Sequence, residues 1–175
     1  MVKQARPYTY FLGTVGSWTY AGLSGLTMNN SLFGTSGAPG IQAAFLQSHD
    51  SAISQSFDSS AGMFSVNFLA ESRSWGGNLV YVLLDGKRLA FNGNEAVLPS
   101  TTLSFTSYAS DAIALGAGRH VLTFTGTLLP DVTTFIDNVA INVSDPTTAV
   151  PEPGSVALLA IGALGAAGIG RRRKS

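Results

Sequence analysis

The sequence predicts an all-β sandwich followed by one apolar segment at the C-terminus, and three observations lead to this prediction. Apolar residues between positions 41 and 143 recur at every second residue, which is the period of a strand with one buried face. Turn-forming residues divide this region into about eight short stretches, the spacing expected of a sandwich. Residues 154–170 carry no charge and are followed at once by basic residues.

Each expected strand combines an apolar pattern with a turn signal at its end. The expected strands are 17–20, 41–47, 52–57, 64–70, 79–84, 87–91, 102–106, 112–115, 119–125 and 135–143. Leu79–Leu84 is an unbroken apolar run, so we expect a central strand covered on both faces, with Tyr81 in the core. Asp85-Gly86 predicts a tight hairpin. Gly116-Ala117-Gly118 predicts a turn before the strand at 119–125. No stretch of this region has the period of an amphipathic helix.

The first forty residues differ from the rest of the region. Seven glycines lie between Gly13 and Gly40, which predicts long loops around one or two strands. We expect residues 1–16 to be irregular, and the strand at 17–20 to carry Trp18 and Tyr20. Long irregular segments of a compact domain are often binding segments.

Composition excludes several classes of function. Charged residues make up 11% of the chain, against about 25% in an average soluble domain. Residues 1–150 hold six basic and nine acidic side chains, so we expect no nucleic-acid partner. The chain has no cysteine, which excludes disulfides, thiol nucleophiles, zinc–thiolate sites and iron–sulfur clusters.

The C-terminal region divides into a linker and three further parts. The polar stretch 144–149 has the composition of a linker. It is followed by the motif Val150, Pro151, Glu152 and Pro153, then by the uncharged run 154–170, and then by the basic cluster Arg171, Arg172, Arg173 and Lys174. The uncharged run is close to the shortest length that spans a bilayer, roughly 17–25 residues. We expect a single transmembrane helix with the basic cluster on the cytoplasmic side and residues 1–150 across the membrane.

The three parts at 150–175 resemble the PEP-CTERM sorting signal of Gram-negative bacteria. The resemblance implies an exosortase as partner, which would cleave near the Pro-Glu-Pro motif and release the protein to the cell surface or the exopolysaccharide matrix. Before this step, the protein would be anchored in the inner membrane on its periplasmic side. The alternative is a plain C-terminal anchor after a proline-rich stalk.

The N-terminus does not agree with export. Residues 1–7 have no apolar core that would serve as a signal peptide. We expect that the true N-terminus, with its signal peptide, is missing from this sequence; the alternative is a tail-anchored protein that stays inside the cell.

A second resemblance covers residues 17–143. It rests on the order of the stretches Trp18–Gly22, Gln42–Gln47, Ile53–Gln55, Gly62–Phe68, Arg73, Asp85–Gly86, Gly118–Leu122 and Phe135–Val139. In this order they resemble the galactose-binding-like jelly rolls of bacterial surface proteins, which are related to carbohydrate-binding modules. The resemblance implies a jelly-roll β-sandwich that binds carbohydrate. The family often opens with an Asn-Gly-(Ser/Asp)-Phe-Glu stretch, and nothing similar precedes Trp18.

The sequence contains no convincing catalytic set, so we expect a protein that is not an enzyme. It has no Gly-x-Ser-x-Gly elbow and no His-Glu-x-x-His motif. The two histidines, His49 and His120, lie on separate segments and are too few for a three-ligand catalytic zinc site. His120 is expected to begin a strand and to have a structural role.

Four residues are the expected glycan contacts: Arg73, Trp75, Trp18 and Tyr20. A guanidinium group can bond vicinal sugar hydroxyls or a uronate carboxylate, and an indole ring can stack on a sugar face. In the alternative interpretation, Arg73 forms an ion pair with Glu71 or Asp137, and Trp18 packs inside the sandwich.

The expected strand 135–143 contains one acid among apolar residues. Its apolar residues Phe135, Val139, Ile141 and Val143 are expected to share one face. Asp137 lies between them, where a carboxylate is costly unless it has a partner. It could accept backbone hydrogen bonds, or it could join Asp50 and Asp58 around a structural calcium ion, which prefers oxygen ligands. We expect no other cofactor.

These observations favour a surface or matrix protein whose sandwich binds the exopolysaccharide or another glycan. One alternative is a structural or adhesive protein whose sandwich binds protein partners and no glycan. A polysaccharide-degrading enzyme is a third hypothesis, for which no catalytic residues are found.

Overall fold

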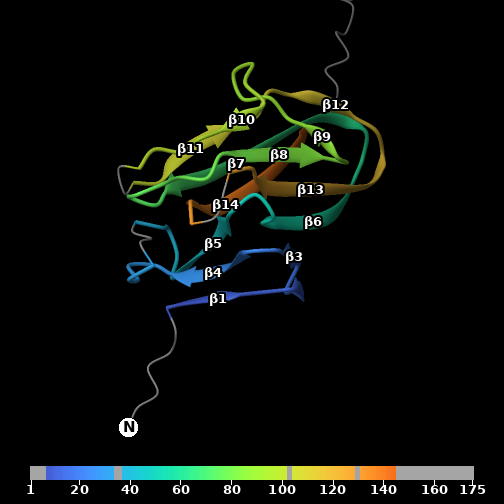
Figure 1. The fold of residues 1–175 in the computed structure, drawn as a ribbon. Coiled ribbons are helices and arrows are strands. Elements are labelled where there is room, and N and C mark those ends of the chain that lie inside the picture. The colour runs from blue at the N-terminus through green and yellow to red at the C-terminus, as the bar shows by residue number, and fades with distance from the viewer. Residues whose placement is uncertain (1–6, 34–36, 102–103, 129–130, 145–175) are drawn as a thin grey trace, which may run out of the picture. The chain divides into compact units, whose positions relative to one another are not determined.

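The structure is a computed structural model that describes residues 7–33, 37–101, 104–128 and 131–144. Every regular element within these ranges is a strand, and the strands form two facing sheets (Figure 1). This confirms the prediction of an all-β sandwich. The linker 144–149, apart from Ser144, and the expected transmembrane helix at 154–170 lie outside the described residues. Among the described residues, no helix of the length and apolar character needed to cross a membrane is found.

The first sheet is antiparallel throughout and has the order β1-β4-β5-β14-β7-β11, with β12 also paired to β7. Its strands are β1 (Tyr8–Tyr10), β4 (Ser24–Met28), β5 (Gln42–Gln47), β7 (Gly62–Ser72), β11 (Thr106–Ala109), β12 (Ile113–Leu115) and β14 (Thr133–Ser144). The longest contact is between β14 and β7, which run beside each other from Thr134↔Ser72 to Ser144↔Met63.

The second sheet is also antiparallel and has the order β10-β8-β13-β6-β3-β2, with β9 paired to β8. Its strands are β2 (Gly13–Val15), β3 (Trp18–Ala21), β6 (Ala52–Ser59), β8 (Val80–Leu84), β9 (Lys87–Arg88), β10 (Ala96–Val97) and β13 (Gly118–Gly126). The chain passes from one sheet to the other after β1, β3, β5, β6, β7, β10, β12 and β13, so neighbours in the sequence often lie in different layers.

The main core fills the space between the sheets. Alternate residues of β7 and β13 point into it, among them Phe64, Phe68, Leu122 and Phe124, which are almost fully buried. The rings of Phe68 and Phe124 join the sheets edge to face, with centroids 5.1 Å apart. Burial of each such side chain contributes about 1.5–3 kcal/mol, so the strict alternation of these two strands fixes which faces meet.

A second, smaller cluster covers the outer face of the first sheet. Phe45 of β5 and Phe135 of β14 pair directly across the strands, and both are fully buried. Phe33, from the loop after β4, packs on both rings. The neighbouring Ile136 belongs to the main core. The beginning of β14 is therefore covered on both faces.

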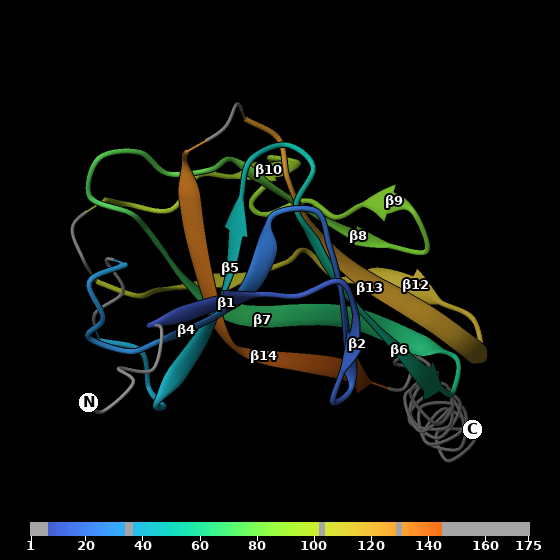
Figure 2. The ribbon, with the colours of Figure 1, turned by 60° about the horizontal axis from the view of Figure 1, so that its bottom comes forward.

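A β-bulge in β14 opens the first sheet. The strand pairs with β5 only from Thr133 to Ile136, and the register with β7 shifts between Asp137 and Ala140. Asn138, inside the bulge, has a positive φ of 50°. From this point β14 follows β7 and leaves β5, as Figure 2 shows. A bulge bends its strand and increases the local twist, and here it separates β14 from β5.

Several predictions need correction. The region 1–16, expected to be irregular, contains β1 and β2, and β4 and β10 were also not predicted. The strand expected at 102–106 is instead β11, which begins at Thr106; residues 102–103 are not described. The run 79–84 is not covered on both faces, because Val80, Val82 and Leu84 are buried while Tyr81 and Leu83 are half-buried. Tyr81 lies on the outer face, where the Arg88 guanidinium covers its ring at 3.7 Å.

The predicted turns agree with the structure. Asp85 and Gly86 both have positive φ angles, 50° and 78°, as the tight turn of a two-residue hairpin requires. They connect β8 to β9, although β9 spans only two residues. The glycine turn at 116–118 connects β12 of the first sheet to β13 of the second.

Candidate functional site

The structure divides the four expected glycan contacts into two pairs. Arg73 and Trp75 follow the end of β7, next to an open pocket of about 230 Å³. Trp18 and Tyr20 belong to β3 and line a separate cavity of about 310 Å³. No residue lines both spaces. We call the first place the Arg73 site and the second the sheet-split cavity.

Aromatic rings surround the guanidinium of the Arg73 site. Its central carbon lies 4.7 Å from the centroid of Phe33 and 4.4 Å from the centroid of Trp75. The Arg73 side chain is only 12% exposed, whereas Trp75 is 67% exposed. Cation–π contacts hold a guanidinium group in a fixed orientation. The contact therefore also places the exposed indole of Trp75 at the surface beside the pocket.

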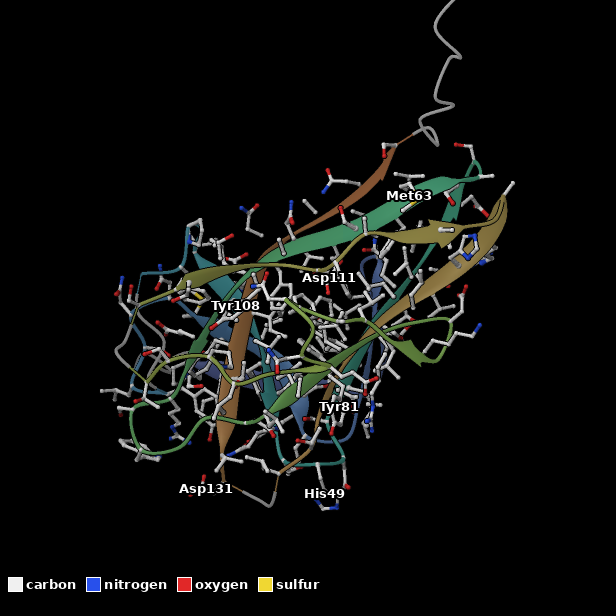
Figure 3. The ribbon with its side chains drawn as sticks, turned by 90° about the horizontal axis from the view of Figure 1, so that it is seen from above. His49, Met63, Tyr81, Tyr108, Asp111 and Asp131 are labelled. Atoms are coloured by element: carbon white, nitrogen blue, oxygen red, sulfur yellow. The ribbon has the colours of Figure 1, made fainter. Side chains whose placement is uncertain are left out.

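A chain of hydrogen bonds forms the polar lining of the Arg73 site. The Tyr10 hydroxyl donates to the Gln47 side-chain oxygen. Gln47 Nε2 donates to Asp131 Oδ1 over 3.1 Å, and Arg73 Nη1 forms an ion pair with the same oxygen over 3.4 Å. Asp131 lies at the same end of the sandwich as His49 (Figure 3). Its side chain is 78% exposed, so part of the carboxylate is open to a ligand.

Electrostatics keep the Tyr10 hydroxyl protonated. Burial raises the pKa of Tyr10, and the nearby Tyr8 and Asp131 act in the same direction, while Arg73 opposes them. A neutral phenol can donate to Gln47, and this donation leaves the Gln47 amide hydrogens directed to Asp131. The lining is therefore ordered before any ligand arrives.

The Arg73 site has the groups that bind a sugar. An exposed indole offers a flat apolar surface to the C–H face of a pyranose ring. Beside it, a guanidinium donor and a carboxylate acceptor can bond adjacent hydroxyls. Among the described residues that line the pocket, Asp131 is the one carboxylate, and there is no histidine, serine or threonine.

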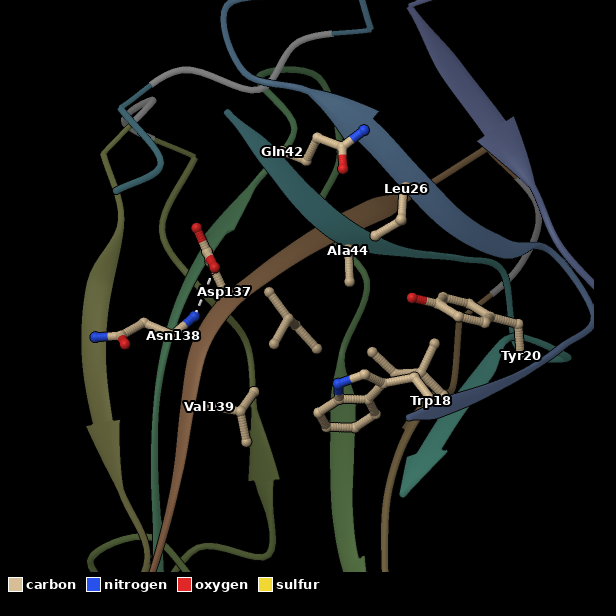
Figure 4. Close-up of a pocket in the computed structure, with 10 residues that line it drawn as sticks. Trp18, Tyr20, Leu26, Gln42, Ala44, Asp137, Asn138 and Val139 are labelled. Carbon is tan, nitrogen blue, oxygen red and sulfur yellow. Dashed lines mark hydrogen bonds between the residues drawn. The ribbon is translucent and has the colours of Figure 1, made fainter. Parts of the chain in front are cut away.

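The sheet-split cavity lies where the bulge separates β14 from β5. Its apolar walls come from both sheets: Leu26, Ala44, Ile53, Ile136 and Val139. Figure 4 shows the Trp18 indole and the Tyr20 hydroxyl directed toward its centre from β3. Trp18 also packs against the core at Phe124, with centroids 6.3 Å apart, so the structure gives this residue both a packing role and a place in the lining.

Three polar side chains stand at the other end of the sheet-split cavity: Gln42, Asp137 and Asn138. Asp137 Oδ1 accepts a hydrogen bond from the Asn138 backbone N–H at 2.7 Å (Figure 4). Its Oδ2 is buried and has no hydrogen-bond partner in the described part of the chain. Burial raises the pKa of Tyr20, so its hydroxyl stays neutral.

The expected calcium ligands do not form a common site. Asp50 Oδ1 lies 2.6 Å from His49 Nε2 in the exposed turn between β5 and β6, while Asp137 lines the sheet-split cavity. Among the described residues, no group of three or more histidine or acidic side chains could hold a metal ion. His120 lies within β13, not at the start of a strand, and pairs with Asp85.

Sequence reasoning missed four of the six residues described above for the Arg73 site. Tyr10, Phe33, Gln47 and Asp131 come from four distant segments, and only the folded chain brings them to Arg73. Asp131 has a positive φ of 70° in the turn before β14. An acid in a loop directly before a long strand is a weak signal of such a residue, and no motif surrounds it.

Comparisons with known proteins identify two features of this chain, its C-terminal motif and its fold. Residues 149–174 match the model of the PEP-CTERM protein-sorting motif. The comparison with curated proteins found no relative. Several solved structures share the fold, and the similar domains are carbohydrate-binding modules.

Three of these structures show the extent of the likeness. TmCBM61, solved with β-1,4-galactotriose, has a TM-score of 0.55 and 16% identity over 75% of this chain and 92% of its own. The CBM22-1 xylan-binding domain of Xyn10C from Paenibacillus barcinonensis has a TM-score of 0.55 and 13% identity over 77% and 90%. A CBM35 from the same organism has a TM-score of 0.52 and 18% identity over 73% and 94%.

These three similar structures are non-catalytic modules, which agrees with the absence of a catalytic set in the sequence. Identities below one fifth establish the shared fold and nothing finer. The chain therefore combines a PEP-CTERM sorting motif at 149–174 with a β-sandwich of the jelly-roll type found in carbohydrate-binding modules.

Proposed function

We propose that this protein is a surface protein whose sandwich binds a glycan at the Arg73 site. The observation that carries the proposal is the exposed Trp75 indole, held by Arg73 beside an ordered polar lining that ends at Asp131. An exposed aromatic next to paired donors and acceptors matches the chemistry of a sugar, which has an apolar ring face and a rim of hydroxyls. The fold shared with carbohydrate-binding modules supports this function.

The C-terminal motif supports a second proposal, about the place where the protein acts. We propose that an exosortase recognises residues 150–174, cleaves near Pro151–Pro153 and releases the sandwich from the periplasmic side of the inner membrane. The product would then reach the cell surface or the exopolysaccharide matrix, where a polysaccharide ligand is abundant. Binding and sorting are separate proposals, because the first depends on the sandwich and the second on the tail.

Binding of the full-length protein to a panel of polysaccharides, including the matrix of the producing cell, tests the first proposal. Trp75→Ala removes the stacking surface and should lower the affinity about tenfold or more. Arg73→Lys keeps the charge but loses the planar group that contacts the ring and the carboxylate, so it should also weaken binding. Binding measured by affinity electrophoresis or calorimetry gives both values.

Tyr81→Ala is the matched control. Tyr81 is also an aromatic under a guanidinium, that of Arg88, but it lies on the outer face of the second sheet, away from the Arg73 site. It should leave polysaccharide affinity unchanged. If Trp75→Ala binds every polysaccharide as tightly as the unmodified protein, the Arg73 site is not the glycan site.

A further inference from the structure

The segment between β9 and β10 contains a tight turn that the proposed function does not use. Asn92 and Gly93 are its two central residues, with positive φ angles of 51° and 78°, the sign that a two-residue hairpin turn requires. The flanking Phe91 and Asn94 exchange two backbone hydrogen bonds, of 2.7 and 3.1 Å. The Phe91 side chain is buried and its ring packs edge to face on Phe68, so the turn is anchored in the main core.

Asn92 and Gly93 form the one Asn-Gly pair of the chain, and such a pair can undergo deamidation. In this reaction the Gly93 backbone nitrogen loses its proton to water and attacks the carbonyl carbon of the Asn92 side chain. The bond from this carbon to the side-chain nitrogen breaks, and the nitrogen takes up a proton from water and leaves as ammonia. The product is a five-membered succinimide ring. Water then opens the ring at either of its two carbonyl groups, which gives aspartate or isoaspartate without any oxidant or reductant.

The surroundings of the turn leave Asn92 accessible to this reaction. Asn92 and Gly93 are both exposed, and the Asn92 side-chain amide forms no hydrogen bond within the described part of the chain. Apart from chain neighbours, no heavy atom lies within 4 Å of the place where a Gly93 β-carbon would be. Glycine itself carries no side chain that would hinder closure of the ring.

Asp111, between β11 and β12 (Figure 3), binds the backbone of this turn. Its Oδ1 accepts a hydrogen bond from the Asn92 backbone N–H and its Oδ2 accepts one from the Gly93 N–H, both at 3.1 Å. The Asp111 backbone is held in turn, because its N–H donates to the Ala90 carbonyl at 2.8 Å. Ring closure needs a negative charge on the Gly93 nitrogen, and a carboxylate in direct contact opposes that charge by Coulomb repulsion.

We infer that Asn92 is a deamidation site and that the Asp111 carboxylate restrains its rate. The inference goes beyond the proposed function, since neither the turn nor Asp111 belongs to the residues that line the Arg73 site. Modification weakens the hairpin. Isoaspartate adds one carbon atom to the backbone of a turn with two central residues, so the turn no longer fits the pairing of Phe91 with Asn94.

The rate of deamidation at Asn92 in the full-length protein tests this inference. The protein is kept in mildly alkaline buffer, and peptide mapping by mass spectrometry gives the deamidated fraction of each asparagine over time. Unfolding the same protein in guanidinium chloride separates the turn from Asp111 and should raise the rate about tenfold. In the folded protein, Asp111→Asn loses the charge and one of the two acceptors at nearly the same size, and it should raise the rate at least about threefold.

Two variants that keep Asp111 serve as controls. Asp58→Asn removes the charge of another exposed acid, on β6, which has no hydrogen bond to the turn within the described part of the chain. Ile53→Val shortens a buried core side chain and lowers the urea midpoint, so it shows whether global unfolding limits the rate. Both variants should deamidate at Asn92 as slowly as the unmodified protein. Asn67 and Asn94, which are not followed by glycine, give internal reference rates.

Three outcomes would contradict the inference. If Asp111→Asn, shown to be folded by its urea midpoint, deamidates at the rate of the unmodified protein, Asp111 does not restrain the reaction. If Ile53→Val accelerates the reaction as much as Asp111→Asn does, unfolding controls the rate and the carboxylate does not. The isoaspartate form, separated by chromatography, should have a lower urea midpoint than the unmodified form, and equal midpoints would show that the modification does not weaken the hairpin.

Discussion

At the scale of single residues, His120 has an unusual set of partners. Its Nδ1 lies 2.7 Å from Asp85 Oδ2, and its Nε2 lies 3.0 Å from the carbonyl oxygen of Gly116. Both partners are acceptors, so the ring can donate to both only when both nitrogens carry a proton. The folded state therefore favours the imidazolium, which joins the turn before β13 to the hairpin after β8.

This geometry predicts a stability that depends on pH. The hydrogen bond to Asp85 raises the pKa of His120 above its ordinary value of 6.5, and the same bond lowers the pKa of Asp85 below 3.8. The His120 contribution is thus complete below pH 6.5 and is lost as the pH rises through the raised value. The Asp85 contribution is complete above pH 3.8 and is lost as the pH falls through the lowered value.

Urea unfolding at about pH 5 and about pH 8.5 measures the effect. The unmodified protein should have the higher midpoint at the lower pH. In His120→Gln, which cannot titrate, this difference should shrink. His49 is present in both proteins and cancels in the comparison. An identical pH dependence in the two proteins would contradict the assigned protonation state.

Single residues also show what sequence reasoning could reach. Arg73 and Trp75 are close in the sequence, and their contact in the structure follows from the turn that Gly76 closes by donating to the Arg73 carbonyl. Asp131 could not be predicted as the partner of Arg73, because 57 intervening residues separate them and no periodicity links the two positions. A contact between residues close in the sequence can be predicted from it, whereas a contact between distant loops cannot.

At the scale of elements, Asn78 joins three loops at one end of the sandwich. Its buried side chain donates to the Ser48 carbonyl at 2.8 Å and accepts from the backbone N–H groups of Thr127 and Leu128 at 3.1 and 3.0 Å. Gly126 packs so closely that a β-carbon there would lie 2.2 Å from the Asn78 amide nitrogen. The loops before β6, before β8 and after β13 thus depend on one amide group.

Asn78→Ala should destabilise the protein by about 2–4 kcal/mol, because it removes these bonds and takes away the acceptor of the Thr127 and Leu128 backbone N–H groups. The free energy of unfolding in urea gives the value. Asn67→Ala is the matched control: Asn67 is exposed on β7, and its loss should change stability by less than about 0.5 kcal/mol. If both substitutions change the free energy of unfolding equally, the Asn78 side chain does not stabilise these loops.

The bulge in β14 also explains why one prediction, that four apolar residues of this strand share a face, is wrong. Phe135, Val139, Ile141 and Val143 were expected to share a face, but Phe135 lies in the outer cluster and the other three pack on the main core. The extra residue of the bulge between Asp137 and Ala140 reverses the alternation. A pattern of period two identifies a strand with high success, but it does not show where an extra residue has been inserted. The same bulge created the sheet-split cavity, which the sequence did not indicate.

At the scale of the whole molecule, the predicted class of fold is correct because it depends on many residues together. About eight stretches between 41 and 143 have alternating or apolar residues, a pattern that does not fit helices with one buried face, so an error in a single strand does not change the predicted class. The short strands β1, β2, β4 and β10 have no comparable pattern. Residues 13–28 contain four glycines, and β4 owes its position to pairing with both β1 and β5. Tertiary pairing, and not local preference, produces these strands.

The division of charge along the chain separates the sandwich from the tail. Residues 1–150 contain six basic and nine acidic side chains, whereas 151–175 contain four basic and one acidic. Basic residues beside an apolar segment stay on the cytoplasmic side of a membrane. The sorting proposal uses a preference that is read from the sequence: prolines at 151 and 153 favour an extended backbone over a helix, and an extended segment is the form that a protease accepts.

The sorting proposal predicts a change of location when the two prolines are replaced. Replacement of Pro151 and Pro153 by alanine keeps Glu152, the apolar run and the basic cluster, so membrane insertion should be unchanged while cleavage is lost. In the producing cell, the variant should remain at its full length in the inner-membrane fraction and disappear from the surface and the matrix, as judged by immunoblot and intact mass. Leu98→Ala, a substitution of an exposed residue of the sandwich, should be sorted normally. A variant that lacks both prolines and still reaches the matrix in a shortened form would show that the motif acts only as a stalk.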